Sequence, residues 1–238
     1  MKEKLVIIGT GSLSGEVVDF VKRYDLYDIV GFSVDKKYIK NETHLGYPVY
    51  PLEELDSYID KEQVKLFVSI SWYQNMNRVK RAKYEELKAA GYHFANLISP
   101  TATVFAHEMG EGNWINDGCY IAFNSRIGNN NTFCHQTYLS HFSDVGDHNV
   151  FSARSNVAGS TTIGDQNYVG IGAIVFNKII VGNKCVIGGG AIVKRNLPDF
   201  SLVVAADSIV KQKDTDSIEK YISLDHIKKT IGDEKIKK

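Results

Sequence analysis

Residues 139–157 read LSHFSDVGDHNVFSARSNV, and every sixth residue of this stretch, beginning with Leu139, is apolar. The same spacing covers fifteen consecutive sixth positions, from Met109 to Val193. An α-helix repeats after about 3.6 residues and a β-strand after about two, so neither element explains a period of six. A period of six predicts a β-helix, in which each unit supplies one short strand and one corner.

Two further regular spacings in the sequence support a β-helix. The residue two before each apolar position is mostly small or carries an amide, as in Cys119, Ser125, Asn131, Thr137, Ser143, Asn149, Ser155, Thr161, Asn167, Ala173, Cys185 and Ala191. Glycine follows the apolar residue at intervals of eighteen, at Gly110, Gly128, Gly146, Gly164 and Gly182. Eighteen is three units of six, so one coil has three strands and three corners. We expect the glycines at a corner whose backbone conformation disfavours a Cβ.

The first hundred residues follow a different pattern. Residues 5–8, 29–34 and 66–70 are apolar runs that predict strands, and residues up to about Arg23 predict a helix after the first run. A segment after Pro51 also has helical character. Alternation of strands and helices indicates a small parallel sheet.

A glycine-rich loop, GTGSLSG over residues 9–15, follows the first strand. Gly9, Gly11, Ser12 and Gly15 are candidates for holding a phosphate at a helix N-terminus, and Asp35 stands where an acid would meet a ribose or a base edge. A purely structural tight turn is an equal alternative, because the spacing is GxGxxxG. A full dinucleotide domain needs more strands than fit before residue 100, which disfavours NAD chemistry.

Composition narrows the class of protein. Lys plus Arg and Asp plus Glu are both 28, so the chain has no basic excess for binding nucleic acid. The opening apolar run is too short for a signal peptide or a membrane span, which predicts a cytoplasmic protein. Three cysteines in unrelated contexts form neither a disulfide framework nor a zinc motif.

The small sheet, the repeat and the junction FANLISPTATV at residues 94–104 together resemble one family from the first strand to about Lys211. This family comprises the hexapeptide-repeat sialic acid O-acetyltransferases and the bacillosamine-pathway nucleotide-sugar N-acetyltransferases. The resemblance implies an α/β + β fold. A Rossmann-like domain over residues 1–100 would bind the nucleotide sugar, and a left-handed parallel β-helix over residues 101–213 would carry acyl transfer. It also implies a homotrimer with active sites between subunits.

An apolar stripe from Ile218 to Ile227 predicts a helix and charged tail over residues 214–238.

The family's general base lies in a segment that residues 138–146, YLSHFSDVG, match, which places the base at His141. From the residues alone, His141 is on an outward corner, and either a surface histidine or a proton acceptor fits there. Gly159 follows eighteen residues later, one coil above. Its N–H matches the family's donor to the thioester carbonyl, while steric need at a corner is the equal alternative.

Ile171 and the run Gly188, Gly189, Gly190 and Ala191 match family positions that line the coenzyme A channel. Acetyl-CoA is therefore the implied co-substrate.

The chain also departs from the family. Phe142 replaces the acid that follows the catalytic histidine in relatives, so Asp144, Asp117 or a backbone carbonyl would have to orient His141. His135, His141 and His148 suggest a metal site like that of γ-class carbonic anhydrases, but their spacing differs from that family's. We expect no metal.

The leading hypothesis is therefore acetyl-CoA-dependent N-acetylation of a nucleotide-linked amino sugar, such as a UDP- or dTDP-4-amino-4,6-dideoxy sugar, in surface-glycan biosynthesis. O-acetylation of sialic acid or another glycan hydroxyl uses the same groups and stays open. A trimeric scaffold that only binds a sugar nucleotide is the non-enzymatic alternative.

Overall fold

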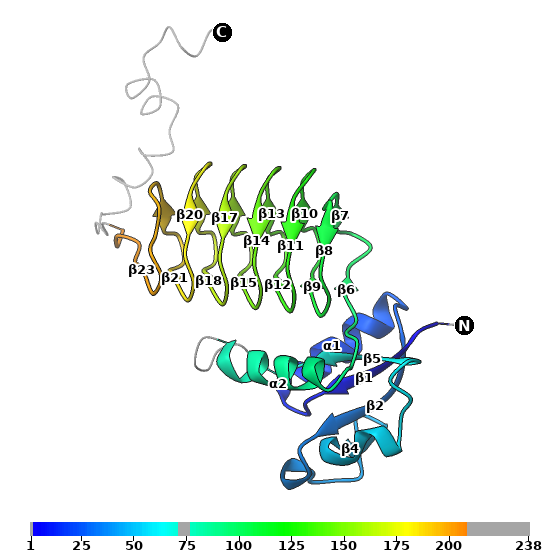
Figure 1. Ribbon diagram of the computed structural model, residues 1–238. Coiled ribbons are helices and arrows are strands. Elements are labelled where there is room, and N and C mark those ends of the chain that lie inside the picture. The colour runs from blue at the N-terminus through cyan, green and yellow to red at the C-terminus, as the bar shows by residue number, and fades with distance from the viewer. Residues whose placement is uncertain (1, 71–76, 209–238) are drawn as a thin grey trace, which may run out of the picture. The chain divides into compact units, whose positions relative to one another are not determined.

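The computed structural model describes residues 2–70 and 77–208 (Figure 1). The helix predicted over residues 214–238 lies outside the described residues, and so does the segment 71–76. Among the described residues, no helix is long and apolar enough to span a membrane.

The N-terminal domain is built on a five-stranded sheet with the order β3-β4-β2-β1-β5. Its strands are β1 (Lys4–Ile8), β2 (Asp28–Val34), β3 (Thr43–His44), β4 (Tyr47–Pro51) and β5 (Val64–Val68), all parallel except β3. The helices are α1 (Ser12–Arg23), α2 (Arg78–Ala89) and the short 3-10 helices η1 (Lys36–Tyr38) and η2 (Leu52–Ser57). The predicted parallel sheet is confirmed.

Hydrophobic burial explains why these segments form the sheet. The apolar residues of β1 are at most 1 % exposed, and α1 buries Val17, Phe20 and Val21 against the sheet. The expected helical segment after Pro51 is the 3-10 helix η2, and the strand expected at residues 66–70 is β5, shifted by two residues. Strand β4 was not predicted, because its two prolines are typical of loops.

The second part of the chain is a parallel β-helix with three walls, each a stack of two-residue strands. The first wall contains β7 (Thr103–Val104), β10 (Tyr120–Ile121), β13 (Tyr138–Leu139), β16 (Asn156–Val157), β19 (Ile174–Val175) and β22 (Ile192–Val193). The second wall contains β8 (Glu108–Met109), β11 (Arg126–Ile127), β14 (Asp144–Val145), β17 (Thr162–Ile163) and β20 (Ile180–Val181). The third wall contains β6 (Leu97–Ile98), β9 (Trp114–Ile115), β12 (Thr132–Phe133), β15 (Val150–Phe151), β18 (Tyr168–Val169), β21 (Val186–Ile187) and β23 (Leu202–Val203).

Each residue of the six-residue apolar register is the second residue of one of these strands, and all but Met109 are buried. Strands pair with those eighteen residues away, for example Phe133 with Phe151. The predicted left-handed β-helix, with its period of six and its coil of eighteen, is confirmed. We call the turn from the first to the second wall the first corner, the next turn the second corner, and the turn from the third to the first wall the third corner.

The inward amide register forms a ladder at the second corner. The side-chain oxygen of Asn113 accepts the backbone N–H of Asn131 at 2.9 Å, and Asn131 in turn accepts that of Asn149 at 2.8 Å. Asn167 continues the series to Cys185. These buried amides satisfy backbone donors that the corner leaves without a strand partner.

The glycines with period eighteen have a different cause from the one expected. None of Gly110, Gly128, Gly146, Gly164 and Gly182 has a positive φ. A Cβ on Gly128 would instead lie 2.7 Å from the carbonyl oxygen of Gly146, and one on Gly164 would lie 2.8 Å from that of Gly182. Close stacking of successive coils therefore requires these glycines. Positive φ values occur at other corner residues, such as Asn130 and Gln166.

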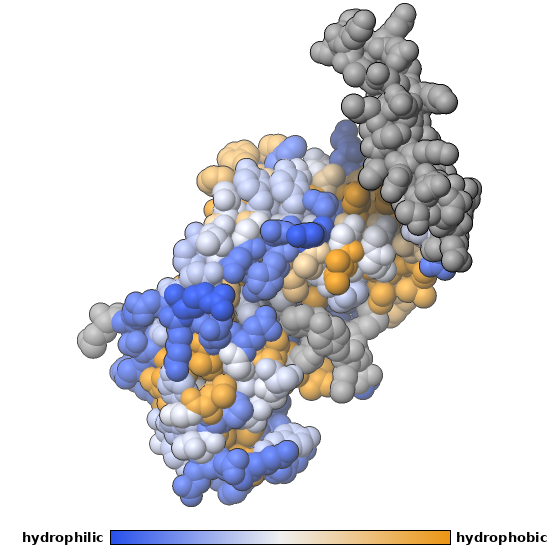
Figure 2. Space-filling model, turned by 180° about the vertical axis from the view of Figure 1, so that it is seen from behind, coloured by the Kyte–Doolittle hydropathy of each residue, from blue (hydrophilic) through white to orange (hydrophobic). Residues whose placement is uncertain are grey.

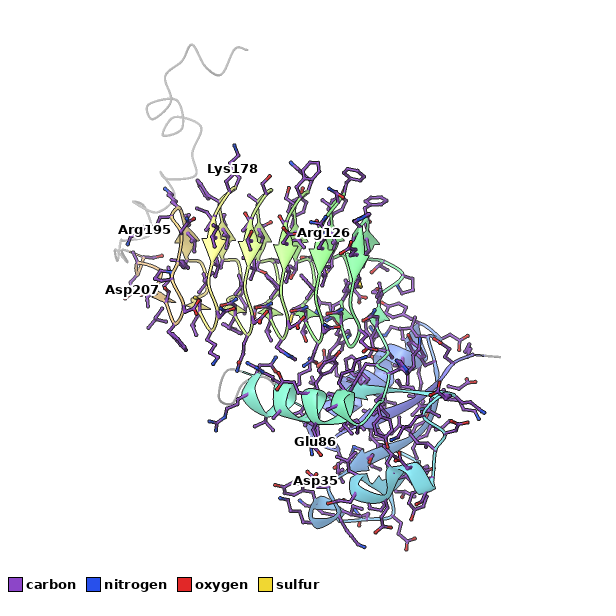
Figure 3. The ribbon with its side chains drawn as sticks, viewed as in Figure 1. Asp35, Glu86, Arg126, Lys178, Arg195 and Asp207 are labelled. Carbon is purple, nitrogen blue, oxygen red and sulfur yellow. The ribbon has the colours of Figure 1, made fainter. Side chains whose placement is uncertain are left out.

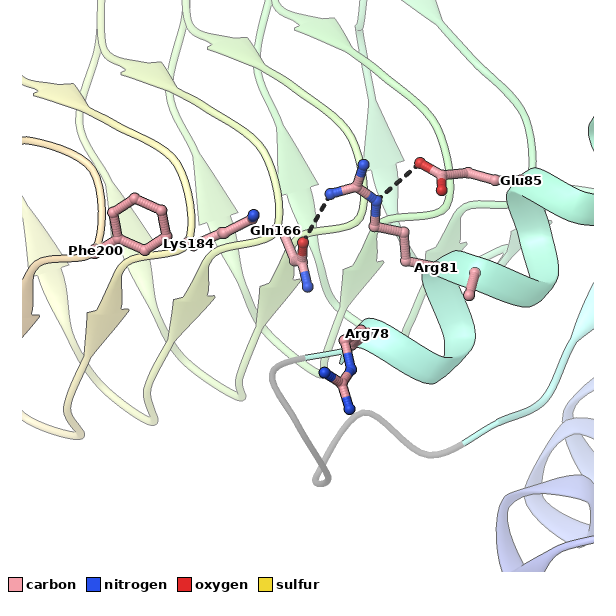
Figure 4. Close-up of a pocket in the computed structure, with 7 residues that line it drawn as sticks. Arg78, Arg81, Glu85, Gln166, Lys184 and Phe200 are labelled. Atoms are coloured by element: carbon pink, nitrogen blue, oxygen red, sulfur yellow. Dashed lines mark hydrogen bonds and ion pairs between the residues drawn. The ribbon is translucent and has the colours of Figure 1, made fainter.

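Helix α2 contacts the second corner through polar side chains. Asn77 donates to the carbonyl of His148 at 2.9 Å, and Arg81 donates to the Gln166 side chain at 2.8 Å (Figure 4). Lys80 is 2 % exposed and lies 3.3 Å from the Thr132 hydroxyl, and burial lowers the pKa of Lys80 to about 7. The apolar core is also shared, because Trp114 of β9 packs edge-on against Phe20 of α1. The sheet domain and the β-helix are therefore held together by both kinds of contact.

Candidate active site

His141 lies on the first corner, between β13 and β14, and its side chain is exposed. Lys178, which Figure 3 labels, lies on the same corner two coils further along. The corner is formed because residues 140–143 leave the first wall through a residue with positive φ, Phe142 (φ 55). Exposure of an imidazole at such a turn leaves it accessible to a substrate.

Gly159 occupies the equivalent position one coil above. A Cβ on Gly159 would lie 3.0 Å from His141 Nε2 and 3.1 Å from the His141 carbonyl oxygen, so the glycine leaves room for the ring. Within residues 2–70 and 77–208, no backbone carbonyl accepts the Gly159 N–H. A backbone N–H without a carbonyl partner is able to donate to an oxygen that gains charge during acyl transfer.

Replacing Gly159 with alanine is expected to reduce turnover and to leave the fold intact. Gly159 does not have a positive φ, so alanine suits its backbone, but the added methyl group would displace the imidazole. We expect a loss of kcat of about tenfold or more, measured as release of CoA thiol, with an unchanged thermal midpoint. Undiminished kcat in the Gly159 variant would contradict the steric argument.

Neither of the acids considered for orienting His141 reaches it. Asp144 pairs with Arg126 at 3.4 Å, and Asp117 accepts the Tyr24 hydroxyl at 2.8 Å. His141 Nδ1 lies 3.1 Å from the hydroxyl oxygen of Ser140, a partner that the sequence did not reveal.

An aromatic ring contacts the imidazole on another side. The Phe142 ring meets His141 edge-on with centroids 5.4 Å apart, and it also contacts Phe123 of the coil below at 6.0 Å. Phe123 is 66 % exposed and Phe142 is 50 % exposed. Figure 2 shows separate apolar patches (orange) among polar surface on one face of the molecule. An apolar shell would weaken competition from water for polar contacts at the imidazole.

The residues predicted to line the coenzyme A channel lie on the third corner. Ile171 is 64 % exposed, and its carbonyl accepts the Gly190 N–H at 2.8 Å. Gly188 is partly exposed, and Gly189 and Gly190 are exposed, whereas the side chain of Ala191 faces the core. The third corner and the first corner are opposite edges of the first wall. A single chain therefore holds Ile171 and His141 at different edges of the β-helix.

The predicted nucleotide site is a pocket of about 310 Å³ at the carboxyl ends of β1, β2 and β5. Gly9, Gly11 and Asp35 line it, while Ser12 and Gly15 belong to α1 and do not. Gly9 has a φ of 111 and precedes α1, whose first residue follows Gly11. Such a loop presents backbone N–H groups of a helix N-terminus to a ligand, as expected for a phosphate.

Asp35 does not stand alone in this pocket. The Lys83 ammonium of α2 lies 2.9 Å from the Asp35 carboxylate and 2.8 Å from that of Glu86. Burial opposes the charge on Lys83, but the hydrogen bonds to Glu86 and Asp35 outweigh it and raise the pKa of Lys83. Figure 3 shows Asp35 and Glu86 in the same region of the domain. Lys83 was not predicted, because nothing in its helical context distinguishes it from a surface lysine.

The three histidines considered for a metal lie on three different corners. His135 is exposed on the third corner, His141 is on the first, and His148 is buried on the second. His148 Nδ1 bonds the Asn130 side chain at 2.9 Å, and burial lowers the pKa of His148. Within the part of the chain that the structure describes, no cluster of three metal-ligating side chains occurs.

A further pocket, of about 540 Å³, separates α2 from the second corner (Figure 4). Arg78, Arg81 and Lys184 line it, but Glu85 pairs with Arg81 at 2.8 Å. We assign this pocket to the contact between α2 and the β-helix.

The chain is a Rossmann-like domain followed by a left-handed β-helix, with an exposed histidine at one corner of the helix. Residues 4–87 match the family model described as the PglD N-terminal domain. A comparison with curated protein sequences found no match.

Solved structures of three bacterial proteins share the fold of the whole chain. One is a histidine-to-asparagine variant of perosamine N-acetyltransferase from Caulobacter crescentus in complex with CoA and GDP-perosamine. It is 23 % identical, with a TM-score of 0.74 over 88 % of this chain and 97 % of that one. The acetyltransferase domain of PglB from Neisseria gonorrhoeae is 23 % identical, with a TM-score of 0.70 over 82 % and 93 %. WeeI from Acinetobacter baumannii is 22 % identical, with a TM-score of 0.71 over 84 % and 96 %. The resemblance predicted from sequence is confirmed at the level of domain family and fold.

Proposed function

We propose that this chain transfers the acetyl group of acetyl-CoA to the amine of a nucleotide-linked amino sugar. The amine nitrogen attacks the thioester carbonyl carbon, and His141 Nε2 takes a proton from that nitrogen. The Gly159 N–H donates to the carbonyl oxygen as it becomes negative. The carbon–sulfur bond then breaks, and the proton passes to the departing CoA thiolate. No covalent enzyme intermediate is formed.

The observation that carries this proposal is the place of Gly159 above His141, where a Cβ would lie 3.0 Å from Nε2, in a chain whose residues 4–87 match the PglD N-terminal domain. This arrangement brings a base and a backbone N–H to the same corner, and the N-terminal part of the chain has a pocket with a helix N-terminus and Asp35. The perosamine N-acetyltransferase of the same fold binds CoA and GDP-perosamine, which supports this pairing of substrates.

The chain acts as a homotrimer in this proposal. His141 and the Ile171–Gly189 region lie at opposite edges of one wall, so a thioester bound along Ile171 of one subunit would meet His141 of another. The exposed rings of Phe123 and Phe142 suit a covered interface. Light scattering should give about three times the 26.6 kDa chain mass, and a fully active monomer would contradict the shared site.

The biological setting is part of the same proposal. Acetyl-CoA and nucleotide sugars are both cytoplasmic metabolites, and an N-acetylated sugar nucleotide would serve lipopolysaccharide or capsule assembly. In this proposal the protein works in the cytoplasm and without a metal.

A panel of acceptors tests the function. The protein is mixed with acetyl-CoA and with UDP-, dTDP- or GDP-linked 4-amino sugars, sialic acid or other hydroxyl acceptors, and products are read by mass spectrometry. We expect an acetylated amine that resists mild base. A base-labile product would indicate O-acetylation, and failure of a folded sample to bind acetyl-CoA at millimolar concentration in calorimetry would indicate a non-catalytic scaffold.

A further inference from the structure

The Ser140 hydroxyl stands out among the side chains of the first corner. Residues at this position in successive coils lie directly above one another, because the N–H of Ala122 bonds the carbonyl of Leu139 and that of Ser140 bonds Val157. The neighbours of Ser140 in this column are Ala122 below and Ala158 above. Serine therefore interrupts a pair of alanines at the one coil that carries the histidine.

The surroundings give this hydroxyl one polar side-chain neighbour. Ser140 is 7 % exposed, and its Oγ lies 3.1 Å from His141 Nδ1. In the described part of the chain no other hydrogen bond of the Ser140 hydroxyl occurs. Ser152 occupies the equivalent position of the third corner, and its hydroxyl bonds the Tyr168 hydroxyl. A serine at the start of a corner is therefore not forced to contact the residue that follows it. A buried hydroxyl next to two methyl groups needs such a partner.

The tautomer of His141 links this contact to chemistry. A neutral imidazole carries one proton, and only the ring nitrogen without it accepts a proton from substrate. Nε2 is the nitrogen that faces Gly159, so Nδ1 must hold the proton in the active form. In this tautomer the Ser140 hydroxyl oxygen is able to accept from Nδ1–H, and the contact fixes the rotation of the ring.

We infer that Ser140 is the positioning residue of the catalytic base: its Oγ accepts the hydrogen bond from His141 Nδ1–H and keeps Nε2 free towards the substrate and Gly159. The inference rests on the proposed function, in which His141 is the base. Ser140 touches no reacting atom and acts only through the imidazole.

Three variants test this role. Ser140→Ala copies the residues above and below it, so the coil should fold normally. Ser140→Thr keeps a hydroxyl, and Ser140→Val has the shape of threonine without one. We expect Ser140→Ala and Ser140→Val to lower kcat by about 3- to 10-fold, the value of one hydrogen bond. The KM for acetyl-CoA and for the amino sugar should be unchanged, and Ser140→Thr should recover most of kcat.

A spectroscopic measurement separates positioning from packing. Nitrogen-15 spectra of protein labelled at histidine, with His141→Ala used to assign the signal, should show the Nδ1–H tautomer in the unaltered protein and a larger Nε2–H fraction in Ser140→Ala. Unchanged kcat and tautomer in Ser140→Ala would overturn the inference, as would equal losses in the threonine and valine variants. If His141→Ala itself keeps full turnover, the proposed function fails, whereas an inactive His141→Ala with a fully active Ser140→Ala refutes only the role of Ser140.

Discussion

Replacing His141 with alanine is expected to lower kcat by about 10²- to 10⁴-fold, the range that a positioned general base contributes. The imidazole is the basic side chain below Gly159, and its Nε2 faces that glycine. Alanine leaves the amine without an acceptor during attack on the thioester. The KM values should change little, because neither substrate depends on the imidazole for most of its binding contacts. Release of CoA thiol measures the effect.

His93→Ala is a suitable control for this substitution. The side chain of His93 is 58 % exposed and belongs to the sheet domain, so its removal deletes the same kind of group away from the first corner. Its kcat should equal that of the unaltered protein. Full turnover by His141→Ala, or equal losses in both variants, would show that His141 is not the base.

The second large effect concerns stability. Replacing Phe151 with alanine is expected to lower the free energy of unfolding by about 3–5 kcal/mol, as deletion of a buried phenylalanine does. The Phe151 ring is 0 % exposed and stacks on Phe133 with centroids 4.6 Å apart and an interplanar angle of 4°. Strand β15 is hydrogen-bonded to β12 and β18, so neighbouring coils have little freedom to close the cavity.

Urea unfolding at one fixed protein concentration measures this change, since association would otherwise contribute to the midpoint. Phe200→Ala is the matched control, because the Phe200 side chain is 71 % exposed. We expect its unfolding free energy to stay within about 0.5 kcal/mol of the unaltered protein. A Phe151 variant as stable as the Phe200 variant would contradict close packing of the phenylalanine stack.

The contacts along the axis of the β-helix could be predicted from sequence for a simple reason. Residues eighteen apart lie above one another, so a period in the sequence is a contact in the structure. The period of eighteen predicted from sequence alone that Gly159 lies above His141. The position of Cys119 and Cys185 within the period of six predicted that both are in the core. The sequence also has alanine eighteen residues before and eighteen residues after Ser140, so the exceptional serine in this column was visible without the structure.

Contacts across a corner or between domains do not follow a repeat in the sequence. The partner of His141 Nδ1 depends on which way two neighbouring side chains turn. The sequence suggested Asp144, Asp117 or a backbone carbonyl, and the structure has the Ser140 hydroxyl. The role of Gly128 was also misjudged, because close approach of the next coil, and not φ, excludes its Cβ.

The sequence by itself determined the β-helix, its inward residues and the coil that carries His141, because each follows from a fixed repeat of residue types. Only the tertiary structure decided that Lys83 pairs with Asp35. It also decided that Arg81 reaches Gln166 and that the Ser140 hydroxyl lies next to His141 Nδ1. These arrangements depend on how a helix docks and where each turn falls around the coil, and such lateral geometry is set by packing in three dimensions.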